Sequence, residues 1–277
     1  MTVLNVLTAD RSGFPAAIGG IHPALTYPSA IRARIPAVIE TGSGADPAVR
    51  RCFAAHPALG TLSEQDRAGL LRGSKIRSLA RQDVISYQGD PAAHVILVLE
   101  GFIKLSATMA DGSEVFVEIA GPGTCIGEML ALHRRPHDAD ATALADCRVL
   151  MIDAGQFRQV FDRKADGLMA ILRLADERLQ AAVERLLDSR ARTAAVRLAK
   201  VLLHVAQLRR AASGDGACLP LRLSQSELGV MAGMSREMVN KHLAQWRDAG
   251  WIRMCGGTVA SVDADALSAM TSETAAD

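Results

Sequence analysis

The stretch Leu223–Ile252, LSQSELGVMAGMSREMVNKHLAQWRDAGWI, predicts two short helices joined by a tight turn. Ser224 and Glu227 have the spacing of a capping box, in which each side chain satisfies a backbone amide at the start of a helix. Gly233 can adopt the left-handed backbone of a sharp turn, and Ser235 is a suitable N-cap for a second helix. We therefore expect one helix on each side of this glycine.

The second helix is expected to run from Arg236 to about Ala249, with Gly250 as its C-terminal stop. At about 100° per residue its side chains separate onto two faces. The packing face holds Val239, Leu243 and Trp246, and the free face holds Arg236, Glu237, Asn240 and Lys241. Reading bases in the DNA major groove requires forked or planar donors and a carboxylate near the start of such a helix. The candidate DNA-binding residues are Ser224, Gln225, Ser235, Arg236, Glu237, Asn240 and Lys241.

This stretch resembles the helix-turn-helix of the cyclic-AMP receptor protein / Fnr (Crp/Fnr) family of bacterial transcription regulators, most closely over Met234–Val239. The resemblance implies transcription regulation, with Arg236 reading guanine and Glu237 reading the amino group of cytosine or adenine. Lys241 stands where the cyclic-AMP receptor group has a second arginine, and lysine lacks the guanidinium fork. Two amphipathic helices around a glycine also occur in other folds, so the rest of the chain must supply the context.

Basic charge gathers around this stretch, although the formal net charge of the whole chain is only +1. Arg190–Gly257 holds eleven Lys and Arg residues against four acidic ones, and the last twenty residues hold four acidic groups and no basic one. Contact with DNA phosphates requires such a concentration of positive charge. A solvated charged face is the alternative explanation of the charge pattern alone.

Short β-rich segments separated by glycine-containing turns occupy the middle of the chain, after a helix that Ser63 can cap. Strands are expected at Val84–Tyr87, Val95–Ser106, Glu114–Ile119, Ala139–Ala145 and Arg148–Ile152. Asp111-Gly112 is a hairpin signal, and many short strands with regular turns predict a rolled antiparallel sheet. The segments that resemble the cyclic-nucleotide-binding β-roll of the same family are Gln88-Gly89-Asp90, Leu99-Glu100-Gly101 and Ile126-Gly127-Glu128.

Apolar residues over Asp166–Ser189 recur at alternating spacings of four and three, which predicts a coiled-coil seam. The expected dimer interface comprises Leu168, Leu172, Ala175, Leu179, Ala182 and Leu186. A parallel homodimer would present two recognition helices to half-sites of a palindromic operator about 34 Å apart. A helix packed only within its own domain is the alternative.

Together these segments predict an α+β fold of four parts. They are a poorly ordered extension at 1–50, a cyclic-nucleotide-binding-like β-roll sensor at 51–163, a dimerisation helix at 164–190 and a winged helix-turn-helix DNA-binding domain at 191–277. We expect helix to continue over Arg190–Leu208, a loop at Ala211–Gly216 and a hairpin wing at Trp251–Val262. The family resemblance covers about residues 55–265.

The resemblance also implies what the sensor pocket can hold. In members that bind cyclic AMP, a glutamate after a glycine accepts from the ribose hydroxyl, and an Arg-Ser pair cradles the cyclic phosphate. Gly127 and Glu128 match the first half, but His137 and Asp138 fall at the Arg-Ser position. A carboxylate there repels a phosphate. A role in capping the helix that follows is the alternative for Glu128.

The adenine side of the pocket departs from the family pattern as well, because Ala182 and Val183 stand where cyclic-AMP binders offer hydroxyls. The candidate effector-pocket residues are Gly127, Glu128, His137, Asp138, Ala182 and Val183. We therefore expect weak or absent binding of cyclic AMP, with a cyclic-nucleotide-responsive activator as the alternative.

Metal, cofactor and enzyme functions find little support in the sequence. Fnr-type oxygen sensing needs several N-terminal cysteines, and only Cys52 lies there. Gly121–Gly127 is unlike a dinucleotide-binding loop because Ile126 replaces the third glycine. The spacing of His133, His137, Asp138 and Asp140 matches no zinc or haem signature. We expect no metal, no cofactor and no catalysis. A β-roll regulatory subunit of a signalling assembly is a second alternative, which the helix-turn-helix disfavours.

The five cysteines are scattered without a paired framework, which suits a reducing compartment, and no apolar run is long enough to predict a membrane span. We therefore expect a cytoplasmic protein with no membrane contact. Its expected partners are a double-stranded DNA operator, a second copy of the chain and RNA polymerase. The sequence does not identify the effector.

Overall fold

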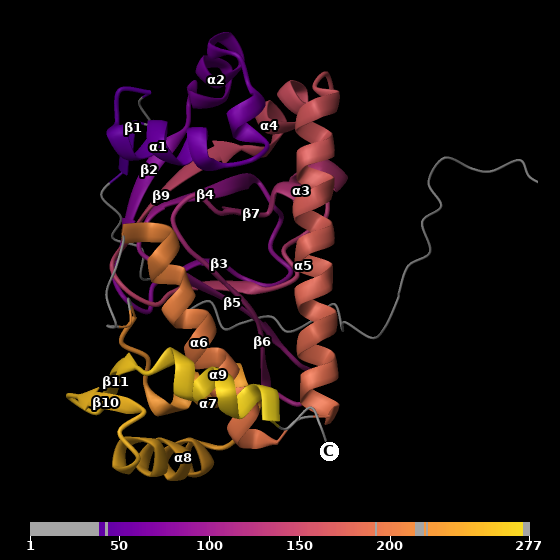
Figure 1. The fold of residues 1–277 in the computed structure, drawn as a ribbon. Coiled ribbons are helices and arrows are strands. Elements are labelled where there is room, and N and C mark those ends of the chain that lie inside the picture. Colours follow the sequence, from indigo (N-terminus) through magenta and orange to yellow (C-terminus); the bar gives the residue numbers. More distant parts are fainter. Residues whose placement is uncertain (1–38, 42–43, 192, 214–218, 220, 274–277) are drawn as a thin grey trace, which may run out of the picture.

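The computed structural model describes residues 39–41, 44–191, 193–213, 219 and 221–273. These residues form a β-roll with flanking helices, one long helix beside the roll, and a small helical domain with a hairpin below it (Figure 1). The predicted fold class is confirmed.

The β-roll consists of two antiparallel sheets with the orders β1-β2-β9-β4-β7 and β3-β8-β5-β6. The strands are β1 (Ile39–Thr41), β2 (Lys75–Leu79), β3 (Val84–Ser86), β4 (His94–Glu100), β5 (Ile103–Thr108), β6 (Glu114–Ala120), β7 (Cys125–Ile126), β8 (Asp140–Ala143) and β9 (Cys147–Asp153). Ile96, Ile103, Ala141 and Val149 are buried between the two sheets. Inward-facing apolar side chains from both sheets therefore form the centre of the roll.

The expected single strand over Val95–Ser106 is wrong, because the chain turns between β4 and β5. Gly101 has φ 81°, and a Cβ atom added there would lie 2.5 Å from the carbonyl oxygen of Asp146. Only glycine fits this close approach at a positive φ. The hairpin expected at Asp111-Gly112 does form, between β5 and β6.

The extension expected over residues 1–50 is too long. Strand β1 pairs with β2, and helix α1 (Pro47–Ala55) begins at an Asp46 N-cap whose carboxylate also pairs with Arg148 at 2.8 Å. Val49 and Phe53 of α1 are buried against the roll. Residues 1–38 and 42–43 of the expected extension lie outside the described residues.

Short helices cover the outer face of the larger sheet. They are η2 (Leu59–Thr61), α2 (Glu64–Leu71), α3 (Glu128–His133) and α4 (Ala154–Phe161). Ser63 caps α2 as expected, by accepting from the amide of Asp66. The rings of Phe157 and Phe161 stack at 4.4 Å between centroids and are almost fully buried. These aromatic rings anchor α4 to the core.

Two helices follow where one continuous helix was expected over Arg190–Leu208. Helix α5 (Ala165–Ala191) stands along one side of the roll, and α6 (Ala194–Ser213) turns back toward it (Figure 1). Helix α6 also occupies part of the loop expected at Ala211–Gly216. Among the described residues, no helix is both long and apolar enough to cross a membrane.

The C-terminal domain packs on α6. Its elements are α7 (Gln225–Ala232), α8 (Arg236–Asp248), β10 (Ile252–Cys255), β11 (Thr258–Val262) and α9 (Ala264–Glu273). The expected hairpin wing is present, with Gly256 and Gly257 at its tip, both at positive φ. Leu202, Trp246 and Leu267 belong to the buried core of this domain. That core continues into the roll through Phe102, Ile119 and Leu144.

Candidate nucleic-acid interface and sensor pocket

The first helix of the candidate DNA interface starts with the capping box that the sequence predicts. The hydroxyl of Ser224 accepts from the amide of Glu227 at 3.2 Å, and the Glu227 carboxylate accepts from the amide of Ser224 at 2.7 Å. These two bonds satisfy amides that otherwise have no partner within the helix. Helix α7 therefore begins at Gln225, as expected.

A close approach of backbones shapes the turn between α7 and α8. Gly233 adopts the expected left-handed conformation, with φ 61°. A Cβ atom on Gly229 would lie only 2.7 Å from the carbonyl oxygen of Met234. Arg197 of α6 donates from Nε to the carbonyl oxygen of Ala232 at 2.9 Å, which satisfies a carbonyl at the end of α7. Sequence reasoning missed both Gly229 and Arg197.

Helix α8 separates into the two predicted faces. Its packing face is buried, with Val239, Leu243 and Trp246 all less than 5% exposed. Its other face is exposed and carries Arg236, Glu237, Asn240 and Lys241. The N-cap Ser235 precedes it, and the side-chain amide of Gln225 on α7 donates to Asn240 at 3.3 Å. The candidate DNA-binding residues thus lie at the start of α7, at the turn and on one face of α8.

Glu237 keeps its negative charge at neutral pH. Its own backbone amide donates to the carboxylate, as does the hydroxyl of Ser235, and these bonds lower the pKa of Glu237. An ionised carboxylate can only accept hydrogen bonds, whereas Arg236 and Lys241 can only donate. The exposed face of α8 therefore presents an acceptor at Glu237 between donors at Arg236 and Lys241.

The candidate sensor pocket centres on a buried ion pair that the sequence did not predict. Glu128 follows Gly127, which caps α3 at φ 83°, and its side chain is 1% exposed. Arg178 of α5 donates to Glu128 Oε1 at 2.6 Å and to the carbonyl oxygen of Cys125 at 2.8 Å. Burial raises the pKa of Glu128, and the charge of Arg178 offsets part of that rise. Glu128 Oε2 has no hydrogen-bond partner in the described part of the chain.

His137 and Asp138, the residues expected at the phosphate position, differ in burial. His137 is 7% exposed, and its Cε1 atom would lie 3.4 Å from a Cβ atom on Gly127, so the ring folds inward beside that glycine. Burial lowers the pKa of His137, which leaves the ring neutral at pH 7. Asp138 is exposed. At these two positions the loop therefore presents a neutral ring and an exposed carboxylate, and neither supplies positive charge.

The expected seam lies on the side of α5 that faces away from the roll. Ala170 and Ile171 are buried against the roll, whereas Leu172, Leu179 and Leu186 are each more than half exposed. The seam residues Leu168 and Ala182 are exposed as well, and Ala175 is partly buried. Ala182 and Val183 follow Arg178 by about one turn of α5 and are exposed. A single chain thus leaves a long apolar face uncovered.

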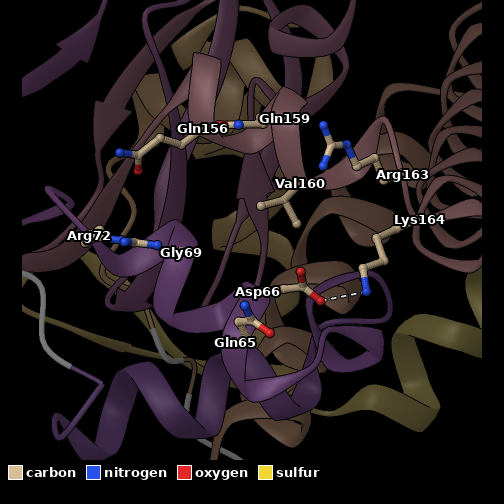
Figure 2. Close-up of a pocket in the computed structure, with 9 residues that line it drawn as sticks. All are labelled: Gln65, Asp66, Gly69, Arg72, Gln156, Gln159, Val160, Arg163 and Lys164. Carbon is tan, nitrogen blue, oxygen red and sulfur yellow. Dashed lines mark ion pairs between the residues drawn. The ribbon is translucent and has the colours of Figure 1, made fainter.

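A hollow lies elsewhere, between α2 and α4 (Figure 2). It has a volume of about 630 Å³ and is crossed by the ion pair of Lys164 with Asp66 at 2.6 Å. Its lining residues are Gln65, Asp66, Gly69, Arg72, Gln156, Gln159, Val160, Arg163 and Lys164. None of the expected site residues lines it. Within the described ranges, no three His, Cys, Asp or Glu side chains are arranged to hold a metal ion.

Comparison with known proteins agrees with this two-part geometry. Residues 76–164 match the cyclic nucleotide-binding domain, and residues 196–270 match the Crp-like helix-turn-helix domain. The chain is 28% identical over 213 residues to the CRP-like cAMP-activated global transcriptional regulator of Mycobacterium tuberculosis, an alignment that covers 73% of this chain and 95% of that protein. It is 30% identical over 180 residues to the Cyclic AMP receptor protein of Thermus thermophilus, over 63% of this chain and 78% of that protein.

The same fold occurs in solved structures. FixK2 from Bradyrhizobium japonicum matches with a TM-score of 0.62 at 20% sequence identity, over 71% of this chain and 96% of that one. At this identity the likeness concerns the fold alone. The Mycobacterium tuberculosis relative is a transcription regulator by name, not an enzyme.

Proposed function

This chain belongs to the Crp/Fnr family of bacterial transcription regulators, and from this premise we propose that it binds a palindromic operator as a homodimer. We propose further that its effector is not cyclic AMP bound through the phosphate cradle that the family usually uses. Its helix-turn-helix makes it a DNA-binding regulator. The operator, the symmetry and the effector are the proposed parts. Action on chromosomal DNA implies a cytoplasmic location.

The exposed polar face of α8 is the observation that carries the proposal. Four side chains able to read base edges lie there, while the opposite face is buried in the domain core. We assign guanine to Arg236 and an amino group of cytosine or adenine to Glu237, in a half-site similar to the TGTGA type of the family. Selection of bound DNA from a random pool tests this directly. We expect an inverted repeat, and a sequence without symmetry would contradict the proposed dimeric reading.

The uncovered seam of α5 supports homodimerisation. Burying one leucine stabilises an assembly by roughly 1.5–3 kcal/mol, and each seam leucine is contributed twice. Leu179→Glu is therefore expected to weaken dimerisation by roughly 3–6 kcal/mol. Sedimentation over a range of concentrations measures this, with Glu177→Ala on an exposed position of the same helix as the control. A Leu179→Glu protein that remains dimeric would remove α5 from the interface.

The sensor loop supports the proposal that cyclic AMP is not held in the usual way. His137 is neutral and folded inward, and Asp138 adds a negative charge beside the place for a phosphate. Like-charge contact in a partly desolvated site is unfavourable. Isothermal titration of the purified protein is expected to detect weak or no binding of cyclic AMP. Micromolar affinity would overturn this part of the proposal.

One observation favours the alternative, a regulator that responds to a nucleotide. Glu128 Oε2 is buried and has no donor among the described residues, so it could accept from a ligand hydroxyl. The two relatives above carry cyclic AMP in their names. Titration with nucleosides and with nucleotides separates recognition of the ribose from recognition of the phosphate, because a nucleoside offers the same ribose hydroxyl without the phosphate charge.

RNA polymerase is the further proposed partner. Transcription in vitro from a promoter that carries the selected operator tests it. An increase or a decrease in transcript relative to a scrambled operator would identify the protein as an activator or a repressor. An unchanged transcript despite operator binding would argue against a polymerase contact.

A further inference from the structure

A single arginine of the β-roll reaches into the DNA-binding domain. Arg81 lies in the turn between β2 and β3, next to Gln82, which has φ 73°. The backbone amide of Arg81 donates to Asp146 at 3.2 Å, and the amide of Gln82 donates to the carbonyl oxygen of Ala143 at 2.8 Å. These bonds fix the base of the side chain on the roll.

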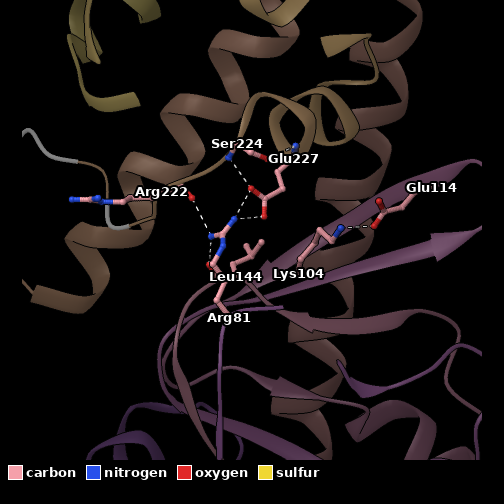
Figure 3. Close-up of polar contacts among 7 residues, drawn as sticks. All are labelled: Arg81, Lys104, Glu114, Leu144, Arg222, Ser224 and Glu227. Atoms are coloured by element: carbon pink, nitrogen blue, oxygen red, sulfur yellow. Dashed lines mark hydrogen bonds and ion pairs between the residues drawn. The ribbon is translucent and has the colours of Figure 1, made fainter. Parts of the chain in front are cut away.

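The guanidinium of Arg81 contacts both domains (Figure 3). One terminal nitrogen donates to the carbonyl oxygen of Leu144 in the roll at 2.5 Å and to that of Arg222 at 3.1 Å. The other donates to both carboxylate oxygens of Glu227, at 2.7 and 2.8 Å. The guanidinium is planar and its donors point in fixed directions, so the carbonyl contacts of one nitrogen and the carboxylate contacts of the other together define one geometry. Arg81 therefore fixes an orientation as well as a distance.

Glu227 already has a structural role, because it is the capping-box carboxylate of α7. The Glu227 carboxylate thus accepts hydrogen bonds both from the amide of Ser224, at the start of the helix-turn-helix, and from the guanidinium of Arg81. The position of α7 is thereby tied to the position of the β2–β3 turn. Sequence offers no sign of this pair, since 146 residues separate its members.

Apolar packing surrounds the pair. Phe102, Ile119 and Leu144 of the roll share one buried cluster with Leu223 and Leu228 of the DNA-binding domain. The side chains of Arg81 and Glu227 are 36% and 18% exposed, so the pair lies at the edge of this contact. Burial of apolar area supplies the attraction between the domains, and the bonds of the Arg81 guanidinium to both of them restrict how they dock.

The docked arrangement leaves the reading face open. Arg236, Glu237, Asn240 and Lys241 are all exposed while α7 is held against the roll. A domain that is already held in place loses less freedom when it binds DNA, which improves affinity without any added contact.

We infer that Arg81 is a positioning residue that holds the helix-turn-helix domain on the β-roll through Glu227, in an orientation that keeps the reading face of α8 open. Arg81 acts through α7 and not by touching DNA. The docking is a property of the free protein, and only its effect on affinity rests on the proposed operator binding.

Two variants test the pair without damaging the helix cap. Arg81→Gln removes the guanidinium, and Glu227→Gln removes the negative charge of its partner while a glutamine still serves the capping box. Arg222→Gln is the matched control, because it removes a positive charge nearby whose side chain points away from the contact (Figure 3). The full-length protein is used in every case, without DNA.

Hydrogen exchange in the free protein measures the docking. Arg81→Gln and Glu227→Gln are each expected to speed exchange of amides in β6 and α7 by roughly two- to fivefold, the range for a partly exposed ion pair. The double variant should exchange no faster than either single variant, because both remove the same interaction. Arg222→Gln should match the wild type. Unchanged exchange in both single variants, or additive effects in the double variant, would overturn the inference.

Operator titration at several salt concentrations gives the second readout. Arg81→Gln is expected to weaken binding roughly two- to fivefold with an unchanged salt dependence. If Arg81 instead bound a DNA phosphate, the slope of log affinity against log salt would fall in magnitude by about 0.9 for each phosphate that the variant no longer neutralises. That result would overturn the inference. If the wild-type protein bound no DNA, the proposed operator binding would fail while the exchange experiment still decided the docking.

Discussion

The reading face of α8 and the sensor pocket contain the same two residue types in opposite conditions. On α8, Arg236 and Glu237 are exposed at the start of the helix. In the pocket, Arg178 and Glu128 lie 2.6 Å apart, and Glu128 is almost fully buried. If the proposed roles hold, DNA meets charged groups that are open to it, whereas an effector meets a glutamate that the protein has already paired. Effector binding at Glu128 has to preserve or replace that internal pair.

The largest expected effect is a loss of folding stability on removing Arg178 from the candidate sensor pocket. Arg178→Ala leaves the carboxylate of Glu128 buried without its partner, which costs about 3–5 kcal/mol in the free energy of unfolding. Urea unfolding measures this loss. Arg173→Ala, at an exposed position of the same helix, is the control and should change stability by about 0.5 kcal/mol or less.

A double variant sharpens this result. Replacing both members of the pair, with Arg178→Met and Glu128→Gln, should cost less than Arg178→Ala alone because no buried charge remains. An Arg178→Ala protein as stable as the wild type would show that the pair has no structural role and would remove the contrast with α8.

The next effect is a pH dependence of folding stability, which comes from His56 in the β-roll domain. His56 is 5% exposed, and its Nδ1 accepts from the amides of Ala58 and Leu59 at 3.2 Å each. Burial, followed by the nearby charge of Arg178, lowers the pKa of His56 from 6.5 to about 4. Between pH 6.5 and about 4, His56 therefore binds a proton in the unfolded chain but stays neutral in the folded chain. The free energy of unfolding accordingly falls as the pH drops through this range. The loss from His56 reaches about 3 kcal/mol near pH 4.

The contribution of His56 can be isolated with His56→Asn, which keeps an acceptor in a similar place but does not titrate. The free energy of unfolding is measured at several pH values from 7 to 4. The variant should lose less stability than the wild type over this range, while other histidines with lowered pKa values, such as His94 and His137, contribute equally to both proteins. Parallel pH profiles would contradict the assignment to His56.

The smallest effect belongs to the reading face. Arg236→Ala is expected to weaken operator binding by about 1–3 kcal/mol and to relax the preference at one base pair. Stability should change by about 0.5 kcal/mol or less, because the side chain is exposed. Binding to the operator and to single-base variants measures both effects, with Gln245→Ala further along α8 as the control. An equal loss over all sequences would make Arg236 a phosphate contact.

Local sequence was sufficient to predict the helix-turn-helix because its determinants lie within a few residues of one another. Ser224, Glu227, Gly233 and Ser235 each act on neighbouring backbone groups, and the period of α8 separates its two faces. The roll was less predictable. The turn at Gly101 depends on contact with Asp146, a residue far along the chain that a local pattern cannot reveal.

The partner of Glu128 in the candidate sensor pocket and the contact between the domains were missed for the same reason. Arg178 is one of several charged residues on α5, and only the fold brings it to Glu128, 50 residues earlier. Arg81 likewise gains its role from Glu227 across the domain boundary. Gly229 did leave a signal, because glycine inside a helix costs about 1 kcal/mol relative to alanine and so indicates a close approach. The approach is to Met234.

The apolar cluster that runs from Phe102 and Ile119 into the C-terminal domain bears on how the protein can be dissected. A fragment that holds only residues 193–273 would expose leucines that the roll now covers, including Leu223 and Leu228. Exposed apolar patches of this kind promote aggregation. The two domains should therefore melt together in calorimetry, and the DNA-reading unit is best handled as part of the whole chain.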